Sequence, residues 1–229
     1  MVKNHIKRIA IPSTWTTAQK KGVTWAPRTR PGSHSLEEGM PLLLVIRELL
    51  KYANTTREVK QILNNKTVLI DGVRRKDPRF TIGFMDIISF PEIKENYRIS
   101  FNENGKLTLV KIAENEATSK ICKINGKGLY KGKMQLRCSD GRTLIVEKGN
   151  YKTTDSVVIS IPDQKIIAHL VFENGAAVLL IAGKRIGALG TIEEIKDETV
   201  TIKSKGEMFE TLKRYCFVVG KNKPVLKIE

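Results

Sequence analysis

The chain has 229 residues, of which 41% are hydrophobic and 6% aromatic, enough apolar surface for folded domains, and its longest apolar run, residues 176–182, is too short to cross a membrane. Forty Lys and Arg stand against 24 Asp and Glu, a net charge of +16 that favours polyanionic partners. Nucleic acid is the first candidate. An anionic membrane ranks well below it, since that partner calls for a basic amphipathic helix or a lipidation motif.

The three cysteines, Cys122, Cys138 and Cys216, are odd in number and widely spaced. This spacing argues against a disulfide framework and against zinc-ligand pairs such as C-x-x-C. We therefore expect a reducing, intracellular compartment, no metal and no cofactor. No apolar segment of the kind found in secretory signals follows the first basic residues.

Residues 1–41 form a basic N-terminal extension in which no acid precedes Glu37. Prolines and glycines interrupt it and no apolar periodicity is visible, which predicts an extended arm that has no core and is disordered when free. A solvated tail is the plain alternative. Tryptophans and histidines among the cations favour RNA, because aromatic rings stack on bases. The predicted RNA contacts here are His5, Lys7, Arg8, Trp15, Lys20, Lys21, Trp25, Arg28, Arg30 and His34.

Residues 42–93 predict a unit of two helices followed by two strands. Apolar residues recur at helical spacing over 42–50, and Thr55 with Glu58 forms a capping box that begins a second helix. The β-branched run at 67–70 predicts a strand, Asp71-Gly72 predicts a hairpin turn, and 87–90 predicts a later strand.

Seven cations lie near the second helix and the hairpin of this unit. Such a cluster can follow the phosphates of a folded RNA, where backbone and shape matter more than base identity. The alternative is a solvated loop, which is disfavoured by the mutual repulsion of three consecutive cations. The residues are Arg57, Lys60, Lys66, Arg74, Arg75, Lys76 and Arg79.

The rest of the chain contains short β-runs at hairpin intervals, which predict an α+β protein with two small barrel-like β-domains, at 94–171 and 172–229. The expected strands cover 97–101, 107–112, 134–138, 144–146, 157–161 and 166–170 in the first domain, and 178–181, 190–195, 200–202 and 216–219 in the second.

The segment Gly183-Lys184-Arg185-Ile186-Gly187 has the wrong glycine spacing for a nucleotide loop, so Lys184 and Arg185 are expected to point outward from a turn and contact RNA. The three histidines are dispersed, and Ser139 lacks the G-x-S-x-G context of a catalytic nucleophile. No catalytic residue is predicted.

Several blocks together resemble the archaeal and eukaryotic small-subunit ribosomal protein family S-four-e. They are His5-Ile6-Lys7-Arg8-Ile9-Ala10-Ile11-Pro12, Ala26-Pro27-Arg28, Leu50-Lys51-Tyr52-Ala53, Ile70-Asp71-Gly72, Gly83-Phe84-Met85-Asp86-Ile87-Ile88 and Phe217-Val218-Val219-Gly220-Lys221-Asn222-Lys223-Pro224.

The resemblance implies an N-terminal arm, an RNA-binding domain shared with the fourth bacterial small-subunit protein, a central β-domain and a C-terminal SH3-like barrel with a KOW motif. Gly187-Ala188-Leu189-Gly190-Thr191-Ile192 resembles the KOW core. The chain lacks the longer basic tail of eukaryotic members, which points to an archaeal type, and the charges after Asp71-Gly72 have their own arrangement.

The leading hypothesis is a non-enzymatic structural component of the small ribosomal subunit in the cytoplasm. Its expected partners are ribosomal RNA and neighbouring ribosomal proteins, with no membrane and no homo-oligomer. Two alternatives remain. An RNA-modifying enzyme could carry the same helix-hairpin module beside a pseudouridine-forming domain, and a regulator of transcription or translation could use the C-terminal barrel.

Overall fold

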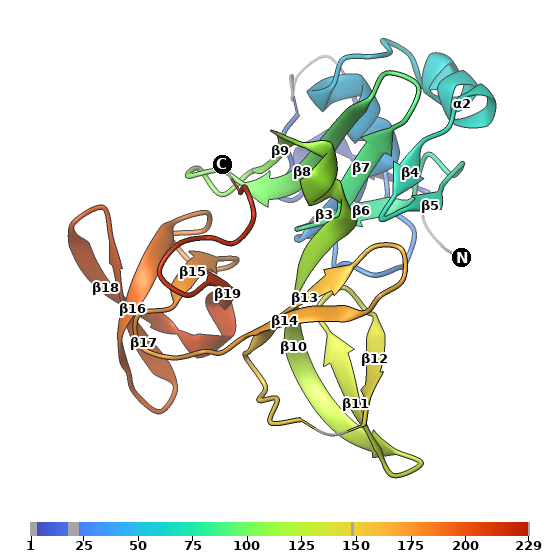
Figure 1. Ribbon diagram of the computed structural model, residues 1–229. Coiled ribbons are helices and arrows are strands. Elements are labelled where there is room, and N and C mark those ends of the chain that lie inside the picture. Colours follow the sequence, from blue (N-terminus) through green and yellow to red (C-terminus); the bar gives the residue numbers. More distant parts are fainter. Residues whose placement is uncertain (1–3, 18–22, 148, 229) are drawn as a thin grey trace. The chain divides into compact units, whose positions relative to one another are not determined.

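The computed structural model describes residues 4–17, 23–147 and 149–228. The chain forms two compact units (Figure 1). The first comprises Met1–Ser100 with Lys106–Ala117, and the second Phe101–Gly105 with Thr118–Glu229. Among the described residues, no helix has the length and apolar character needed to cross a membrane.

The N-terminal segment is folded against the first unit. Strand β1 (His5–Lys7) pairs antiparallel with β2 (Trp25–Pro27), and a 3-10 turn, η1 (Arg8–Ala10), follows β1. Ile11 is 8% exposed and Trp15 2% exposed, so this segment contributes to a core. The expectation of an extended arm without a core is therefore corrected. The buried positions are irregularly spaced and find their partners far along the chain, so no periodic pattern marks them.

The first helical segment is almost entirely buried. Helix α1 (Leu42–Leu44) continues into a π-helical turn, η2 (Val45–Leu49), and every residue from Leu42 to Ile46 is at most 3% exposed. The first N–H groups of a helix have no partner within it. Here they donate to a neighbouring loop, from Leu42 to Phe80 O at 2.9 Å and from Leu43 to Pro78 O at 2.8 Å.

Helix α2 (Thr56–Asn65) begins at the predicted capping box. The Thr55 hydroxyl accepts from the Glu58 N–H at 3.3 Å, and the Glu58 carboxylate accepts from the Thr55 N–H at 3.3 Å. Val59 and Leu63 are fully buried, while the opposite face carries exposed cations. The capping box and the amphipathic character of this helix are confirmed.

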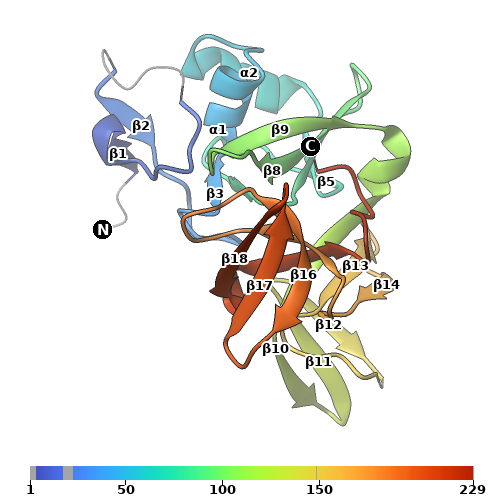
Figure 2. The same cartoon turned by 90° about the vertical axis from the view of Figure 1, so that its left-hand side faces the viewer.

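A short two-stranded pairing and a five-stranded sheet complete the first unit (Figure 2). Strand β3 (Gly39–Pro41) pairs with β6 (Thr81–Gly83). The larger sheet has the order β5-β4-β7-β8-β9. β4 and β7 are labelled in Figure 1, and β8 and β9 in both views. Its strands are β4 (Leu69–Ile70), β5 (Val73–Arg74), β7 (Ile87–Phe90), β8 (Glu95–Phe101) and β9 (Leu107–Ile112).

The predicted hairpin after β4 is confirmed in its turn and its register. Asp71 and Gly72 have φ values of 47° and 75°, as a two-residue hairpin turn requires, and Ile70 pairs with Val73. The Asp71 Oδ1 also accepts from the Ile87 N–H at 2.9 Å, which ties the turn to β7.

The division into compact units does not fall at the expected domain boundary of residue 94. β8 and β9 were assigned to the central domain, but β8 forms a hairpin with β7, in which Phe90 pairs with Glu95. The tight turn between them keeps β8 in the sheet of the first unit, and β9 extends the same sheet. A 3-10 helix, η3 (Glu114–Thr118), then leads to the second unit.

The first sheet of the second unit has the order β12-β11-β10-β13-β14. Its core contains Cys122, Ile124, Leu136, Val157 and Ile159. The twelve-residue strand β10 pairs with β13 through its first half and with β11 through its second half. The strands are β10 (Ser119–Tyr130), β11 (Lys133–Cys138), β12 (Thr143–Val146), β13 (Ser156–Ser160) and β14 (Ile166–Leu170).

The second sheet of this unit has the order β18-β17-β16-β15-β19. Buried Lys123 of β10 donates to the carbonyls of Arg214 at 2.8 Å and Cys216 at 2.7 Å, which connects the two sheets. A 3-10 turn, η4 (Lys213–Tyr215), precedes the last strand. The strands are β15 (Ala177–Leu180), β16 (Leu189–Ile195), β17 (Thr199–Ser204), β18 (Glu207–Leu212) and β19 (Cys216–Gly220).

The three cysteines are buried and free, so no disulfide contributes to this fold. Burial raises the pKa of the Cys216 thiol to about 11, and that thiol is therefore protonated at neutral pH.

Candidate RNA-binding surface

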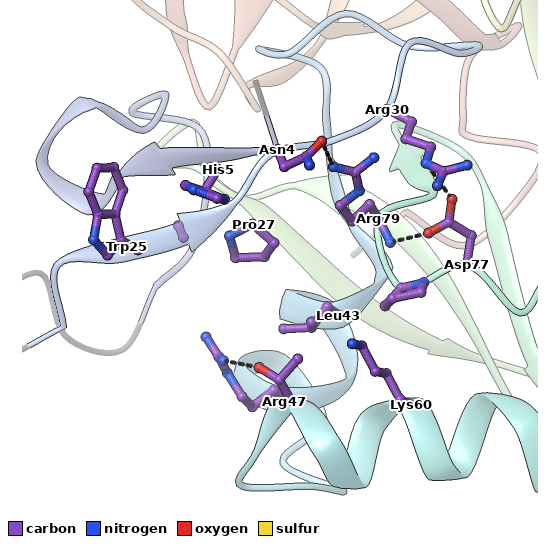
Figure 3. A pocket seen from close by; sticks show the side chains of 13 residues that line it. Asn4, His5, Trp25, Pro27, Arg30, Leu43, Arg47, Lys60, Asp77 and Arg79 are labelled. Atoms are coloured by element: carbon purple, nitrogen blue, oxygen red, sulfur yellow. Dashed lines mark hydrogen bonds and ion pairs between the residues drawn. The ribbon is translucent and has the colours of Figure 1, made fainter. Parts of the chain in front are cut away.

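A cleft of ≈ 750 Å³ lies in the first unit between the β1–β2 pair, the helices and the loop before β6 (Figure 3). The N-terminal segment forms one wall, and α2 with the preceding helical segment forms another. The lining residues that bear on binding are Asn4, His5, Trp25, Arg30, Arg47, Lys60, Asp77 and Arg79.

A second hollow of ≈ 480 Å³ adjoins the first, because Arg30 and Asp77 line both. It adds three consecutive cations, Arg74, Arg75 and Lys76. We call the two hollows together the basic cleft. Among the described residues that line it, seven Lys and Arg face a single carboxylate, that of Asp77. The cleft is thus a concave surface with a strong positive field.

Asp77 positions cations from separate segments and leaves most of the positive charge uncompensated. Its Oδ2 lies 2.9 Å from the Arg30 Nε, and its Oδ1 accepts from the Arg79 N–H at 3.0 Å. The Arg79 guanidinium also donates to the Asn4 side chain, and the Arg30 N–H donates to the Arg79 carbonyl at 3.0 Å. These bonds join the N-terminal segment to the loop before β6 (Figure 3).

Two arginines of the cleft have structural contacts of their own. The Arg74 guanidinium donates to the carbonyls of Asn64 at 3.1 Å and Lys66 at 3.4 Å, at the C-terminal end of α2, where a positive charge is favourable. The Arg75 guanidinium lies 4.6 Å from the centre of the Phe80 ring. These contacts fix the position of the two side chains without neutralising their positive charge.

Three cations around the cleft are exposed and make no ion pair within the part of the chain that the structure describes. They are Arg57 and Lys60 on the solvent face of α2, and Lys76 after β5. Without a carboxylate partner, each is available to a phosphate. Lys66 differs, because its Nζ lies 2.7 Å from Glu92. The hydrogen bond from Lys66 is the main cause that lowers the pKa of the Glu92 carboxyl.

An aromatic pair adds a stacking surface at the cleft. Trp25 is 52% exposed, and its ring meets that of His5 edge-on at 5.4 Å between centroids. Figure 3 shows both side chains on the β1–β2 pair. An exposed indole next to cations provides a platform for an unpaired base.

Three predicted RNA contacts of the N-terminal segment have side chains that the folded protein largely covers. Trp15 donates from its ring nitrogen to Leu36 O at 2.9 Å and Gly39 O at 2.8 Å. Arg8 is 4% exposed and contacts both Glu48 oxygens at 2.6 Å. The His34 side chain is 5% exposed and its Nε2 lies 3.0 Å from Asp86. Each makes a polar contact within the fold and leaves little surface for RNA.

The other sequence-predicted contacts fall in three places. Lys20 and Lys21 lie outside the described residues. Lys7 is exposed on β1 and Arg28 is half-buried just after β2, although neither lines the cleft. Lys184 and Arg185 belong to the second unit. There Lys184 is exposed, and Arg185 contacts Glu207 at 2.9 Å and lies 4.2 Å from the Phe209 ring centre.

Sequence reasoning missed Arg47 as a member of the cleft. Arg47 lies between the apolar positions of the first helical segment. Its side chain lines the cleft and donates to the Thr56 hydroxyl at 3.4 Å and to Glu48 at 2.8 Å. A charged residue among apolar ones could have indicated an exposed side chain. Which residues surround that side chain depends on the packing of η2 against α2.

The arrangement can bind a phosphate backbone through its cations and a base through Trp25. Among the described residues, no group of three His, Cys, Asp or Glu side chains could hold a metal ion.

Two helices followed by a hairpin, with cations gathered on one side, define the class of small RNA-binding domains that includes the S4 domain. The S4 domain description matches residues 40–88 of this chain. On either side of it, the RS4NT domain matches residues 2–37 and the Ribosomal family S4e matches residues 93–166.

Relatives agree with these matches over nearly the whole chain. A protein named small ribosomal subunit protein eS4, from Methanocella arvoryzae, is 43% identical and covers 99% of this chain and 98% of its own length. The protein of the same name from Methanosphaera stadtmanae is 42% identical, with coverage of 99% and 96%. The chain belongs to the ribosomal protein S4e family.

A solved structure supports the same assignment. The crystal structure of the 30S ribosomal protein S4e from Thermoplasma acidophilum superposes with a TM-score of 0.71 at 32% identity, and the match covers 80% of this chain and 96% of that one. The family resemblance inferred from the sequence blocks is therefore confirmed.

Proposed function

We propose that this protein is a structural component of the small ribosomal subunit, in the cytoplasm, and that it binds ribosomal RNA through the basic cleft. The observation that carries the proposal is the cleft itself, where seven cations face one carboxylate in a region matched by the S4 domain. The names of the archaeal relatives, which are small-subunit proteins, supply the ribosomal context.

The cleft recognises RNA by shape and backbone. Phosphates displace water from exposed cations such as Lys60 and Lys76, and condensed counterions are released from the RNA. Arg30 and Arg79 are held by Asp77 and Asn4, so the cleft is organised before RNA arrives. The N-terminal segment acts as a wall of the site, through Trp25 and His5, in place of a free threading arm.

The finer domain organisation is part of the proposal. Residues 172–229 form an SH3-like barrel, with a KOW core at 187–192, and Lys184 and Arg185 offer a further RNA contact beside it. Support comes from the five-stranded sheet and from Gly187, where a Cβ would lie 1.9 Å from Asn102 O. The proposed domain boundaries are 41, 93 and 171. The family match that begins at residue 93 supports the second of them, while the compact units divide after residue 117.

No catalytic role is proposed, and neither is a homo-oligomer. The partners are small-subunit ribosomal RNA and neighbouring ribosomal proteins. Family membership supports this proposal, since the relatives carry the names of ribosomal components. Incubating the protein with ribosomal RNA and mapping modified bases checks it, and any turnover would contradict it.

Binding to a small-subunit ribosomal RNA transcript tests the proposal. The double variant Lys60→Ala/Lys76→Ala removes two exposed cleft cations and should weaken binding, whereas Lys165→Ala, which removes an exposed lysine of the second unit, should not. In a sucrose gradient the native protein should sediment with the small subunit. If it stays with free protein, or if the double variant binds as tightly as the control, the proposal is wrong.

A further inference from the structure

The sheet β12-β11-β10 of the second unit has one face that no part of the function described so far uses. Residues directly opposite each other in a sheet share a face. The pairs Tyr130–Lys133, Gly128–Gln135 and Gly126–Arg137 therefore lie on one face of the hairpin, and β12 adds Ile145 opposite Gln135 and Thr143 opposite Arg137. We call Tyr130, Lys133, Gln135, Arg137, Thr143 and Ile145 the outer face.

The two faces of this sheet differ in burial where β11 pairs with β12, while both are exposed at the end of the β10–β11 hairpin. Leu136 is 0% exposed and Leu144 is 6% exposed, and these two point into the core. On the outer face, Tyr130 is 50% exposed and Ile145 is 56% exposed. Large apolar side chains held on exposed strands, next to polar ones, mark a surface for a partner. Figure 1 shows the β10–β11 hairpin, in yellow-green, extending beyond β12.

Glycines leave the backbone bare in the middle of the outer face. A Cβ at Gly128 would meet nothing within 4 Å, so the strand offers an open position between two functional side chains. A Cβ at Gly126 would lie 3.5 Å from the Arg137 Nε, because the guanidinium lies over this glycine. A flat guanidinium and an exposed phenol ring are both stacking platforms for nucleobases.

The charge around the outer face favours a polyanion. The sequence contains no Asp or Glu between Glu116 and Asp140. Asp140 itself is buried and paired with Lys120 and Arg142, each at 3.1 Å. Glu147, after β12, is exposed and lies 3.1 Å from Lys133.

Two further cations flank the stacking residues. The Lys131 Nζ lies 5.4 Å from the centre of the Tyr130 ring, and Arg137 makes no ion pair among the described residues. A stacking surface between cations without an ion pair fits single-stranded RNA, whose bases stack on the ring and whose phosphates meet the charges. An acidic protein surface would leave the ring without a partner, and an apolar one would leave the charges without a partner.

We propose that the outer face binds unpaired nucleotides of RNA, as a second RNA site of this protein. Tyr130 and Arg137 stack on bases, Gln135 and Thr143 reach base or ribose edges, and Lys131 contacts phosphates. The four strand steps from Lys133, which lies opposite Tyr130, to Arg137 span roughly 13 Å, room for two or three stacked bases. This inference rests on the proposed function, since it assumes an RNA ligand.

Photo-crosslinking of the full-length protein to a 4-thiouridine-containing oligouridine tests the site. The crosslinked peptide should contain Tyr130. Tyr130→Ala should remove this crosslink and weaken binding at this site roughly 5- to 150-fold, the effect of losing one base stack. Leu129→Ala is the matched control, because Leu129 is 82% exposed on the same strand but lies on the opposite face.

The outcomes separate this site from the basic cleft. The inference is supported if Tyr130→Ala loses the crosslink while Leu129→Ala keeps it. It is overturned if both variants crosslink and bind like the native protein while Lys60→Ala/Lys76→Ala still weakens ribosomal RNA binding, and the proposed function then stands. Failure of the native protein to bind either RNA overturns both. If Tyr130→Ala keeps the crosslink but loses a neighbouring protein in reconstituted subunits, the outer face is a protein-docking surface.

Discussion

Trp15 and Trp25 lie in the same basic segment, and the structure gives them opposite environments. Trp15 is 2% exposed with its ring nitrogen bonded to two carbonyls, and Trp25 is 52% exposed at the basic cleft. The sequence around the two tryptophans does not distinguish them, because the carbonyls of Leu36 and Gly39 that bind Trp15 lie far along the chain. Burial assigns one to stability and the other to binding.

Trp15→Ala should destabilise the first unit by about 3–5 kcal/mol, through the lost burial of a large side chain and the cavity left behind. Trp25→Ala should cost about 1 kcal/mol or less, since it loses mainly the edge contact with His5. Denaturant unfolding of both variants checks the difference. Equal stability of the two would contradict the core role of Trp15.

A carboxylate on β8 illustrates a pH effect at the scale of a residue. A hydrogen bond from Lys111 at 2.6 Å, with others from Tyr52 and Tyr97, lowers the pKa of Glu95 to about 2. Burial, together with the Glu95 hydrogen bond, raises the pKa of Tyr52 well above its usual range. Glu95 therefore stays ionised in the folded protein at pH values where a free carboxyl is protonated.

Because the folded pKa is the lower one, the stabilising contribution of Glu95 is present above pH 4.5, the reference pKa, and is lost as the pH falls toward 2. Lys111→Met should raise the Glu95 midpoint toward 4.5, since it removes the largest cause of the shift. Carboxyl NMR titration measures this midpoint. Lys165→Met is the control and should leave it in place; an unchanged midpoint in Lys111→Met would refute the assigned cause.

At the scale of an element, the start of α2 depends on two side chains. The Thr55 hydroxyl and the Glu58 carboxylate each accept a backbone N–H that no helical carbonyl could bind. Thr55→Ala should lower the free energy of unfolding by about 1 kcal/mol. Thr56→Ala is the matched control at the next position, where the hydroxyl only accepts a 3.4 Å bond from Arg47. Thermal unfolding should separate the two variants, and equal losses would speak against the cap.

Elements with local signals could be predicted from the sequence. The capping box, the Asp71-Gly72 turn and strands such as β9 and β14 depend on residues next to one another in the chain. β10 was missed because Lys, Asn and Gly interrupt its apolar residues, and its pairing changes partner halfway. β18 was missed because its exposed polar residues gave no apolar alternation.

The positive charge of the candidate site could be predicted from the sequence, but the segments that line the cleft could not. The hairpin cations were identified from a run of three, and five of the seven cations predicted around α2 and β5 line the cleft. The burial of Arg8 could not be predicted, because its partner, Glu48, lies forty positions away in the sequence. The number of arginines in the sequence does not show which of them form ion pairs, and in the fold some are paired with buried carboxylates.

At the scale of the whole molecule, the +16 charge is distributed over both units, and part of it is engaged in ion pairs. Pairs such as Lys196 with Glu210, at 2.9 Å, and Lys111 with Glu95 are already compensated. The long-range field speeds association, while the affinity comes from cations that meet phosphates. The slope of the binding affinity against salt concentration, both as logarithms, measures the number of those contacts.

The affinity for small-subunit ribosomal RNA should fall steeply with salt, and its logarithm should be linear in the logarithm of the salt concentration. Each lysine that meets a phosphate contributes about one to the slope. Lys60→Ala/Lys76→Ala should therefore make the slope shallower by about two. Lys165→Ala should leave it unchanged, although it lowers the net charge as well. If both reduce the slope equally per charge removed, binding follows net charge and the cleft is not the contact surface.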